Sequence, residues 1–184
     1  MGRLLRAGVA LVACVAILGV ASASASVGTK KISDSKYAKT LCGKLTALDA
    51  SESQLVDQYN ALPVDDPATF QRQAAALVDA YLADIKQAAV QIKKVEPDVG
   101  GGKKISKTFV SYFDDASNEI QTALDTFRAA DPNSPAFQGD VTVFETSLKV
   151  LSARIGDPFS KVTNQELLGA FKKEKSCSEV VSVT

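Results

Sequence analysis

The chain has 184 residues, of which 46% are hydrophobic and 23% are charged. These values are ordinary for a globular protein, so they exclude a disordered chain and a multi-span membrane protein, and the length fits one domain. The 21 lysines and arginines balance 21 aspartates and glutamates, which leaves no net charge to attract nucleic acid or an anionic membrane.

Residues 1–25 predict a secretory signal peptide. Two arginines precede an almost unbroken apolar run at 7–20, and small residues follow it at 21–25. We expect cleavage after Ala25, with Ala23 as the alternative, and a secreted or extracytoplasmic location in the cell envelope. The apolar run is short for a membrane span, so an uncleaved anchor helix is the second interpretation.

Cys14 lies inside that apolar run, in a segment that resembles the box before a lipidated cysteine in bacterial lipoproteins. A lipidation site should end the apolar region, whereas here the run continues through Val20. We therefore expect a soluble mature chain, with a lipid anchor at Cys14 as the alternative. Membrane contact is expected only if the signal stays uncleaved or Cys14 is lipidated.

Two cysteines, Cys42 and Cys177, remain once the signal peptide is removed. Export places them where disulfides persist, and two cysteines allow one intramolecular pairing. The expectation is a disulfide between Cys42 and Cys177. Two free thiols, or thiols paired between molecules, are the alternative.

Four long amphipathic helices are predicted in the mature chain, because apolar residues recur in each at spacings of three, four and seven. A small, polar lead at 26–33 precedes them and is expected to be flexible. Prolines, glycines and aspartates mark the turns. The predicted helices run over 34–62, from Pro67 to about Val95, from Lys103 or Ile105 through Phe127, and from Pro135 or Ala136 to Ile155.

A shorter fifth helix follows, and Cys177 comes directly after it. Residues 34–177 are predicted to form an all-α domain, an up-down four-helix bundle with a short fifth C-terminal helix pinned by the disulfide. No strand is expected, and 178–184 are predicted to be a loose tail. The candidate N-caps are Asp34 or Ser35 for the first helix, Asp66 for the second and Thr163 or Asn164 for the fifth.

Several short motifs accompany this pattern: a cysteine within Leu41–Leu45, an acidic-proline turn at Asp65–Ala68, an Ala-rich stretch at Gln73–Leu77, a second turn at Asp131–Pro132, and Cys177 near the end. With the signal peptide, they resemble small exported helical proteins of actinobacteria. The resemblance implies a helical bundle with a disulfide between the first helix and the C-terminus. It implies no activity, since that family is largely without assigned function.

The sequence contains no histidine. The common serine and cysteine catalytic arrangements need a base, and bundle di-iron sites need Glu-x-x-His, so neither is expected. Tyrosine is the remaining common haem ligand. Tyr37, Tyr59, Tyr81 and Tyr112 all lie on apolar stripes, which predicts core residues with the hydroxyl at the rim. No enzyme activity, metal or cofactor is expected.

Five lysines surround the turn between the second and third helices. The glycines there invite comparison with a phosphate loop, but a proline replaces the first glycine of that motif and no strand precedes it. A milder hypothesis is that these lysines hold an anionic group of an envelope polymer or lipid. Solvated surface lysines are the alternative. The five are Lys93, Lys94, Lys103, Lys104 and Lys107.

The sequence therefore favours a secreted, non-enzymatic helical bundle that binds a protein or another component of the cell envelope, and no nucleic acid. The alternative is a carrier of a small apolar ligand or lipid held between the helices. Four aromatic residues are the candidates to line such a pocket: Phe109, Tyr112, Phe113 and Phe144.

Overall fold

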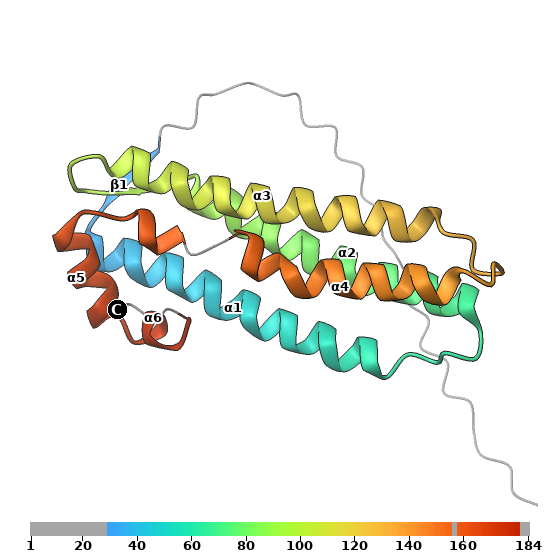
Figure 1. The fold of residues 1–184 in the computed structure, drawn as a ribbon. Coiled ribbons are helices and arrows are strands. Elements are labelled where there is room, and N and C mark those ends of the chain that lie inside the picture. The colour runs from blue at the N-terminus through green and yellow to red at the C-terminus, as the bar shows by residue number, and fades with distance from the viewer. Residues whose placement is uncertain (1–28, 156–157, 181–184) are drawn as a thin grey trace, which may run out of the picture.

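The computed structural model describes residues 29–155 and 158–180, and this part is largely helical (Figure 1). The all-α prediction is confirmed. The predicted signal peptide, Cys14 and the last four residues of the predicted tail lie outside the described residues. In chain order the elements are β1 Lys30–Ile32, α1 Asp34–Asn60, α2 Pro67–Ile92, β2 Val95–Pro97, α3 Gly102–Ala129, α4 Phe137–Ile155, a 3-10 helix Pro158–Lys161, α5 Gln165–Lys173 and α6 Lys175–Val180.

Two helices begin at caps that the sequence predicts. Asp66 caps α2, where its carboxylate accepts a hydrogen bond from the Thr69 backbone N–H at 3.1 Å. Asn164 caps α5 by accepting from the Leu167 backbone N–H at 2.9 Å. The first helix differs, since Ser33 is its N-cap and makes no side-chain cap bond. α1 thus starts at the predicted residue without the predicted capping side chain.

A short parallel strand pair corrects two expectations, a flexible lead and the absence of strands. β1 pairs with β2, and the Lys30 backbone N–H donates to the Lys94 carbonyl at 2.9 Å. α2 ends at Ile92 rather than near Val95. Pro97 disfavours helical backbone in the residue before it, so the chain is extended here and offers an edge to β1.

Two glycines make the turn from β2 into α3. Gly101 has a φ of 79°, in the left-handed region that favours glycine. A Cβ atom on Gly102 would lie 2.0 Å from the carbonyl oxygen of Pro97, so glycine is required there for space. α3 therefore begins at Gly102, close against β2 and one residue before the predicted start at Lys103.

The C-terminal segment is more helical than predicted, since α6 extends through residue 180 where a loose tail was expected from 178. Three aromatic rings pack where this segment meets α3. Phe159 of the 3-10 helix lies 5.1 Å from Phe109, and Phe171 of α5 lies 5.0 Å from Phe159, between ring centroids. This cluster fills one end of the core.

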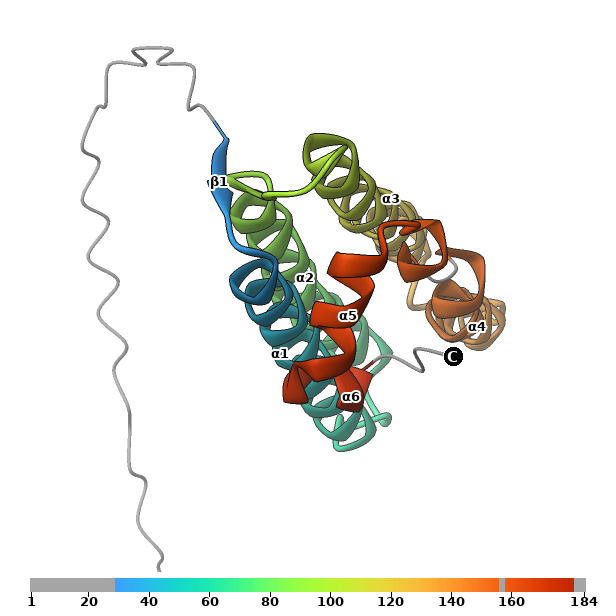
Figure 2. The ribbon, with the colours of Figure 1, turned by 90° about the vertical axis from the view of Figure 1, so that its left-hand side faces the viewer.

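The four long helices pack in sequence order, α1 on α2, α2 on α3 and α3 on α4, and successive helices run in opposite directions (Figure 1). α1 and α4 stand at the two edges of this arrangement, and their described residues do not pack closely on each other. Viewed along the bundle, α5 and α6 lie between α1 and α4 (Figure 2). The bundle is therefore closed by the C-terminal helices over only part of its length.

Tyr37 departs from the expected rim position, because its side chain is fully buried. Its hydroxyl has no partner at hydrogen-bonding geometry. Burial raises the pKa of Tyr37, and the nearby Ser106 hydroxyl opposes part of that rise. Ser106 is itself buried and donates to the Val95 carbonyl at 2.8 Å. Two hydroxyl groups thus lie inside the junction of α1, β2 and α3.

Candidate binding groove

The apolar stripe of α1 is fully buried over only its first third. Tyr37, Ala38, Leu41 and Cys42 are buried, whereas none of the residues of α1 after Cys42 is buried. The helical period continues, but its later members are only partly buried. These are Leu45, Leu48, Leu55 and Tyr59.

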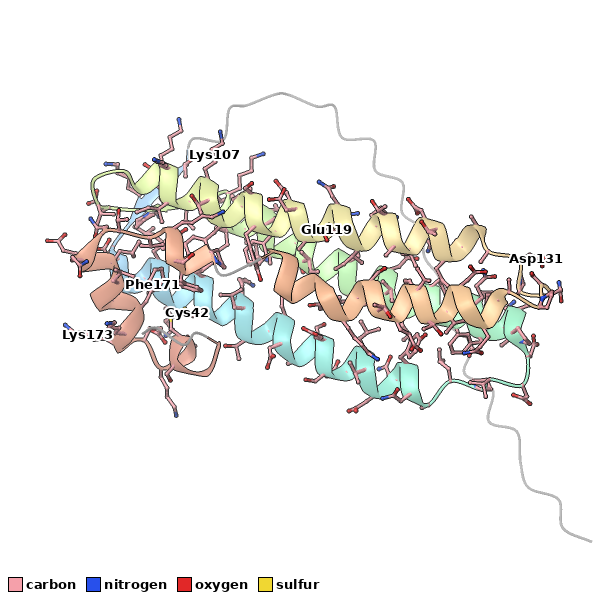
Figure 3. The ribbon with its side chains drawn as sticks, in the orientation of Figure 1. Cys42, Lys107, Glu119, Asp131, Phe171 and Lys173 are labelled. Carbon is pink, nitrogen blue, oxygen red and sulfur yellow. A yellow bond between two sulfur atoms is a disulfide. The ribbon has the colours of Figure 1, made fainter. Side chains whose placement is uncertain are left out.

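α6 covers the beginning of that stripe. Cys42 is bonded to Cys177 of α6, with the two Cα atoms 4.9 Å apart, which confirms the predicted disulfide. One turn further along α1, the Thr46 hydroxyl donates to the Ser176 carbonyl at 3.3 Å. Figure 3 shows Cys42 and Phe171 at the same end of the bundle. The C-terminal helices thus protect the first half of α1 and leave the second half open.

A groove of about 610 Å³ follows the uncovered part of α1. α1 and α4 form its walls, and α2 and α3 form its floor. It is open to solvent along one side, so it is a surface groove rather than an enclosed cavity. The apolar side chains that line it include Leu48, Leu55, Ile85, Phe113, Ile120 and Leu148.

Two tyrosines place their hydroxyls at the rim of this groove, as the sequence predicts for them. The Tyr59 hydroxyl on α1 donates to Glu145 Oε1 on α4 at 3.2 Å, and the Tyr81 hydroxyl on α2 donates to Glu52 Oε2 on α1 at 3.5 Å. Burial, and then the nearby carboxylates, raise the pKa of both tyrosines. Both hydroxyls therefore stay protonated and remain donors at neutral pH.

The rim is acidic on the α1 wall and carries both signs of charge on the α4 wall. Asp49 and Glu52 stand on the α1 wall, and Glu145 stands on the α4 wall. Lys149 is the basic side chain among the described lining residues. Three carboxylates and one ammonium give a formal charge of −3 + 1 = −2 at neutral pH. The groove thus combines an apolar floor with a negatively charged edge.

The four aromatic residues proposed to line one apolar pocket lie in different places. Tyr112 and Phe113 line the groove. Phe109 is fully buried in the aromatic cluster with the C-terminal helices. Phe144 stacks on Phe127 with ring centroids 4.3 Å apart and lines a separate hollow between α3 and α4. The α1 leucines complete the groove instead, and their continuing stripe was the signal that could have found them.

The five lysines proposed to hold an anion are all exposed. The strand pair adds Lys30 and Lys31 beside them, which sequence reasoning missed because β1 and β2 are far apart in the chain. Lys31 forms an ion pair with Asp98 at 3.4 Å. Figure 3 shows Lys107 extending away from the helices at this end of the bundle. The lysines therefore gather at one end, and none of them lines the groove.

Residues 29–155 and 158–180 contain no group of three or more His, Cys, Asp and Glu side chains placed to hold a metal ion. Among the helices of this same part, none combines the length and the apolar character that crossing a membrane requires. A scan against protein-family models and searches of curated proteins and of solved structures found no match to this chain.

Proposed function

We propose that this chain is an exported, non-enzymatic protein that binds the apolar surface of a partner in the groove between α1 and α4. The observation that carries the proposal is the apolar stripe of α1, which continues past Thr46 to Tyr59 with no C-terminal helix over it among the described residues. Apolar surface left in water costs about 25 cal/mol per Å². A contiguous apolar groove with a polar rim is typical of an interaction site.

Two features support export. The signal-peptide pattern at residues 1–25 directs a chain out of the cytoplasm, and it lies outside the described residues. The Cys42–Cys177 disulfide suits the oxidising conditions outside the cytoplasm, where such bonds persist. The absence of histidine from the sequence supports a binding role over catalysis, since no imidazole base is present to activate a nucleophile.

A small apolar ligand is the second candidate occupant. The groove volume of about 610 Å³ lies within the usual range of ligand pockets, which is roughly 300–1,000 Å³. Such pockets bury most of the ligand, about 70–90% of its surface. This groove is open along one side, so a small ligand would keep a large part of its surface in water. The geometry therefore favours a partner with its own folded surface.

The proposal is tested by photo-cross-linking in the native host. A photoreactive amino acid is introduced at Val56, in the α1 wall, or at Val90, on α2 outside the groove lining. Val90 is a matched control for Val56, because the two side chains are 52% and 51% exposed, respectively. Cross-links to one cell-envelope component at Val56, with none at Val90, are the expected result.

The mass of the cross-linked adduct separates the two candidates. A protein adduct supports partner binding, and a lipid adduct supports the carrier. Equal cross-linking at both positions would mean that the partner does not bind specifically in the groove. Retention of the tagged chain in the cytoplasm of the native host would contradict the exported role.

A further inference from the structure

We infer that the groove accepts an amphipathic α-helix of a partner protein, with basic side chains flanking the apolar face of that helix. This inference rests on the proposed function, because it names the chemistry of the partner for the same groove. It is carried by the length of the groove, its place in the fold and the charge of its rim.

The groove has the length of a short helix. Its α1 wall runs from Leu45 to Asn60, and at a rise of about 1.5 Å per residue this wall is about 22 Å long. A partner helix of about four turns would lie along it and would displace the hydrogen bond from Tyr59 to Glu145, which crosses the groove near one end. Leu48, Leu55 and Tyr59 recur along the wall at the helical period and would meet apolar side chains of the partner at the same period.

The place of the groove in the fold favours a helix as occupant. α5 and α6 lie between α1 and α4 at one end of the bundle (Figure 2), and the disulfide bonds α6 to α1. Past Thr46, no described C-terminal element covers α1, and the groove lies open there. A bound helix would pack on the part of α1 that α5 and α6 leave uncovered.

The charge of the rim selects a basic occupant. The three carboxylates of the rim, Asp49, Glu52 and Glu145, outnumber the single ammonium of Lys149, so the net field would repel the carboxylate of a fatty acid. They would also repel a second copy of this chain, which presents the same acidic rim. Lysine or arginine side chains beside the apolar face of a helix would pair with these carboxylates, which keep lone pairs free to accept further hydrogen bonds.

The test uses three labelled synthetic peptides of about 16 residues, the number that spans the groove. The first has leucines at the helical period flanked by lysines, the second replaces those lysines with glutamates, and the third scrambles the first. Binding to the full oxidised chain is measured by fluorescence anisotropy at low salt. The lysine peptide should bind about tenfold or more tighter than either other peptide, and added salt should weaken it.

Variants of the chain locate the peptide. Leu55→Lys places a charge in the groove and should weaken the lysine peptide about tenfold or more, while Val90→Lys should leave its binding unchanged. Replacing both Glu52 and Glu145 with Gln should reduce the preference for lysine over glutamate. Circular dichroism establishes that each variant remains folded before its affinity is compared.

Several results would overturn the inference. The glutamate peptide could bind as tightly as the lysine peptide or more tightly, or oleate could displace the lysine peptide with higher affinity. Either result would mean that the groove binds a ligand of another chemical class. A dimer in sedimentation that Leu55→Lys dissociates would make a second copy the occupant. If no probe binds and Val56 gives no cross-link, the proposed function fails as well.

Discussion

The Tyr59 hydroxyl on α1 donates a hydrogen bond to Glu145 on α4, at 3.2 Å, across the groove that separates the two helices. Tyr59→Phe should lower the free energy of unfolding by about 0.5–1.5 kcal/mol, the usual net value of one such bond. Urea unfolding measures the loss. In a Glu145→Ala background the same substitution should cost less, because the acceptor is already gone. Fully additive losses would show that the bond contributes nothing to stability.

Three tyrosines should ionise at a higher pH in the folded protein than in the unfolded chain. Burial is the main cause that raises the pKa of Tyr37, Tyr59 and Tyr81 above the ordinary value of 10.0. The stability they contribute is fully present below pH 10 and is lost as the pH rises above it, because the unfolded chain releases these protons first.

The tyrosinate absorbance at about pH 11 measures this difference in ionisation, because unperturbed tyrosines are largely ionised at that pH. The native protein should show much less tyrosinate than the same protein in denaturant. A matching signal in the two states would mean that these hydroxyls are solvated like free tyrosine.

The disulfide should be a major source of stability. It joins residues 135 apart in the chain, and closing so long a loop stabilises by about 4 to 5 kcal/mol on the chain-entropy model. Replacing both Cys42 and Cys177 with serine should lower the urea midpoint strongly. Hydrogen exchange should accelerate first in α5 and α6, which the bond fastens to α1. An unchanged midpoint in the double variant would contradict this role.

Two glycines offer a matched pair of alanine substitutions. Gly102→Ala should destabilise the protein, because the new Cβ would lie 2.0 Å from the Pro97 carbonyl oxygen and the turn would have to move. Gly43→Ala should stabilise it by up to about 1 kcal/mol, because Gly43 lies within α1 and, apart from the adjacent residues and the nearby helix backbone, nothing lies within 4 Å of the added Cβ. Thermal melting of the two variants should give shifts of opposite sign.

The lysine-rich end should promote binding to anionic surfaces. Replacing Lys103, Lys104 and Lys107 with Gln should weaken binding to vesicles that contain anionic lipid, measured by sedimentation at low salt. The control replaces three other exposed lysines and changes the net charge equally: Lys172, Lys173 and Lys175. Lys107 and Lys173 lie at the same end of the bundle but on opposite sides of it (Figure 3), so the control tests which side of this end binds. An equal loss in both variants would show that net charge alone matters.

The sequence by itself was enough to locate the four long helices, α5 and the disulfide. Helical periodicity and capping depend on contacts within one or two turns, so they can be read from neighbouring residues. The Asp66 and Asn164 caps follow this rule. The pairing of Cys42 with Cys177 needed only the count of cysteines left outside the predicted signal peptide.

The tertiary structure alone decided which parts of those helices are covered. The stripe of α1 looks uniform in the sequence, yet α6 protects it as far as Thr46 and leaves Leu48 and Leu55 at a groove. Likewise Phe109 is sealed in the core while Tyr112, one turn away, faces the groove. Burial of an apolar side chain depends on which distant segment packs over it. The spacing of neighbouring residues in the sequence does not contain that information.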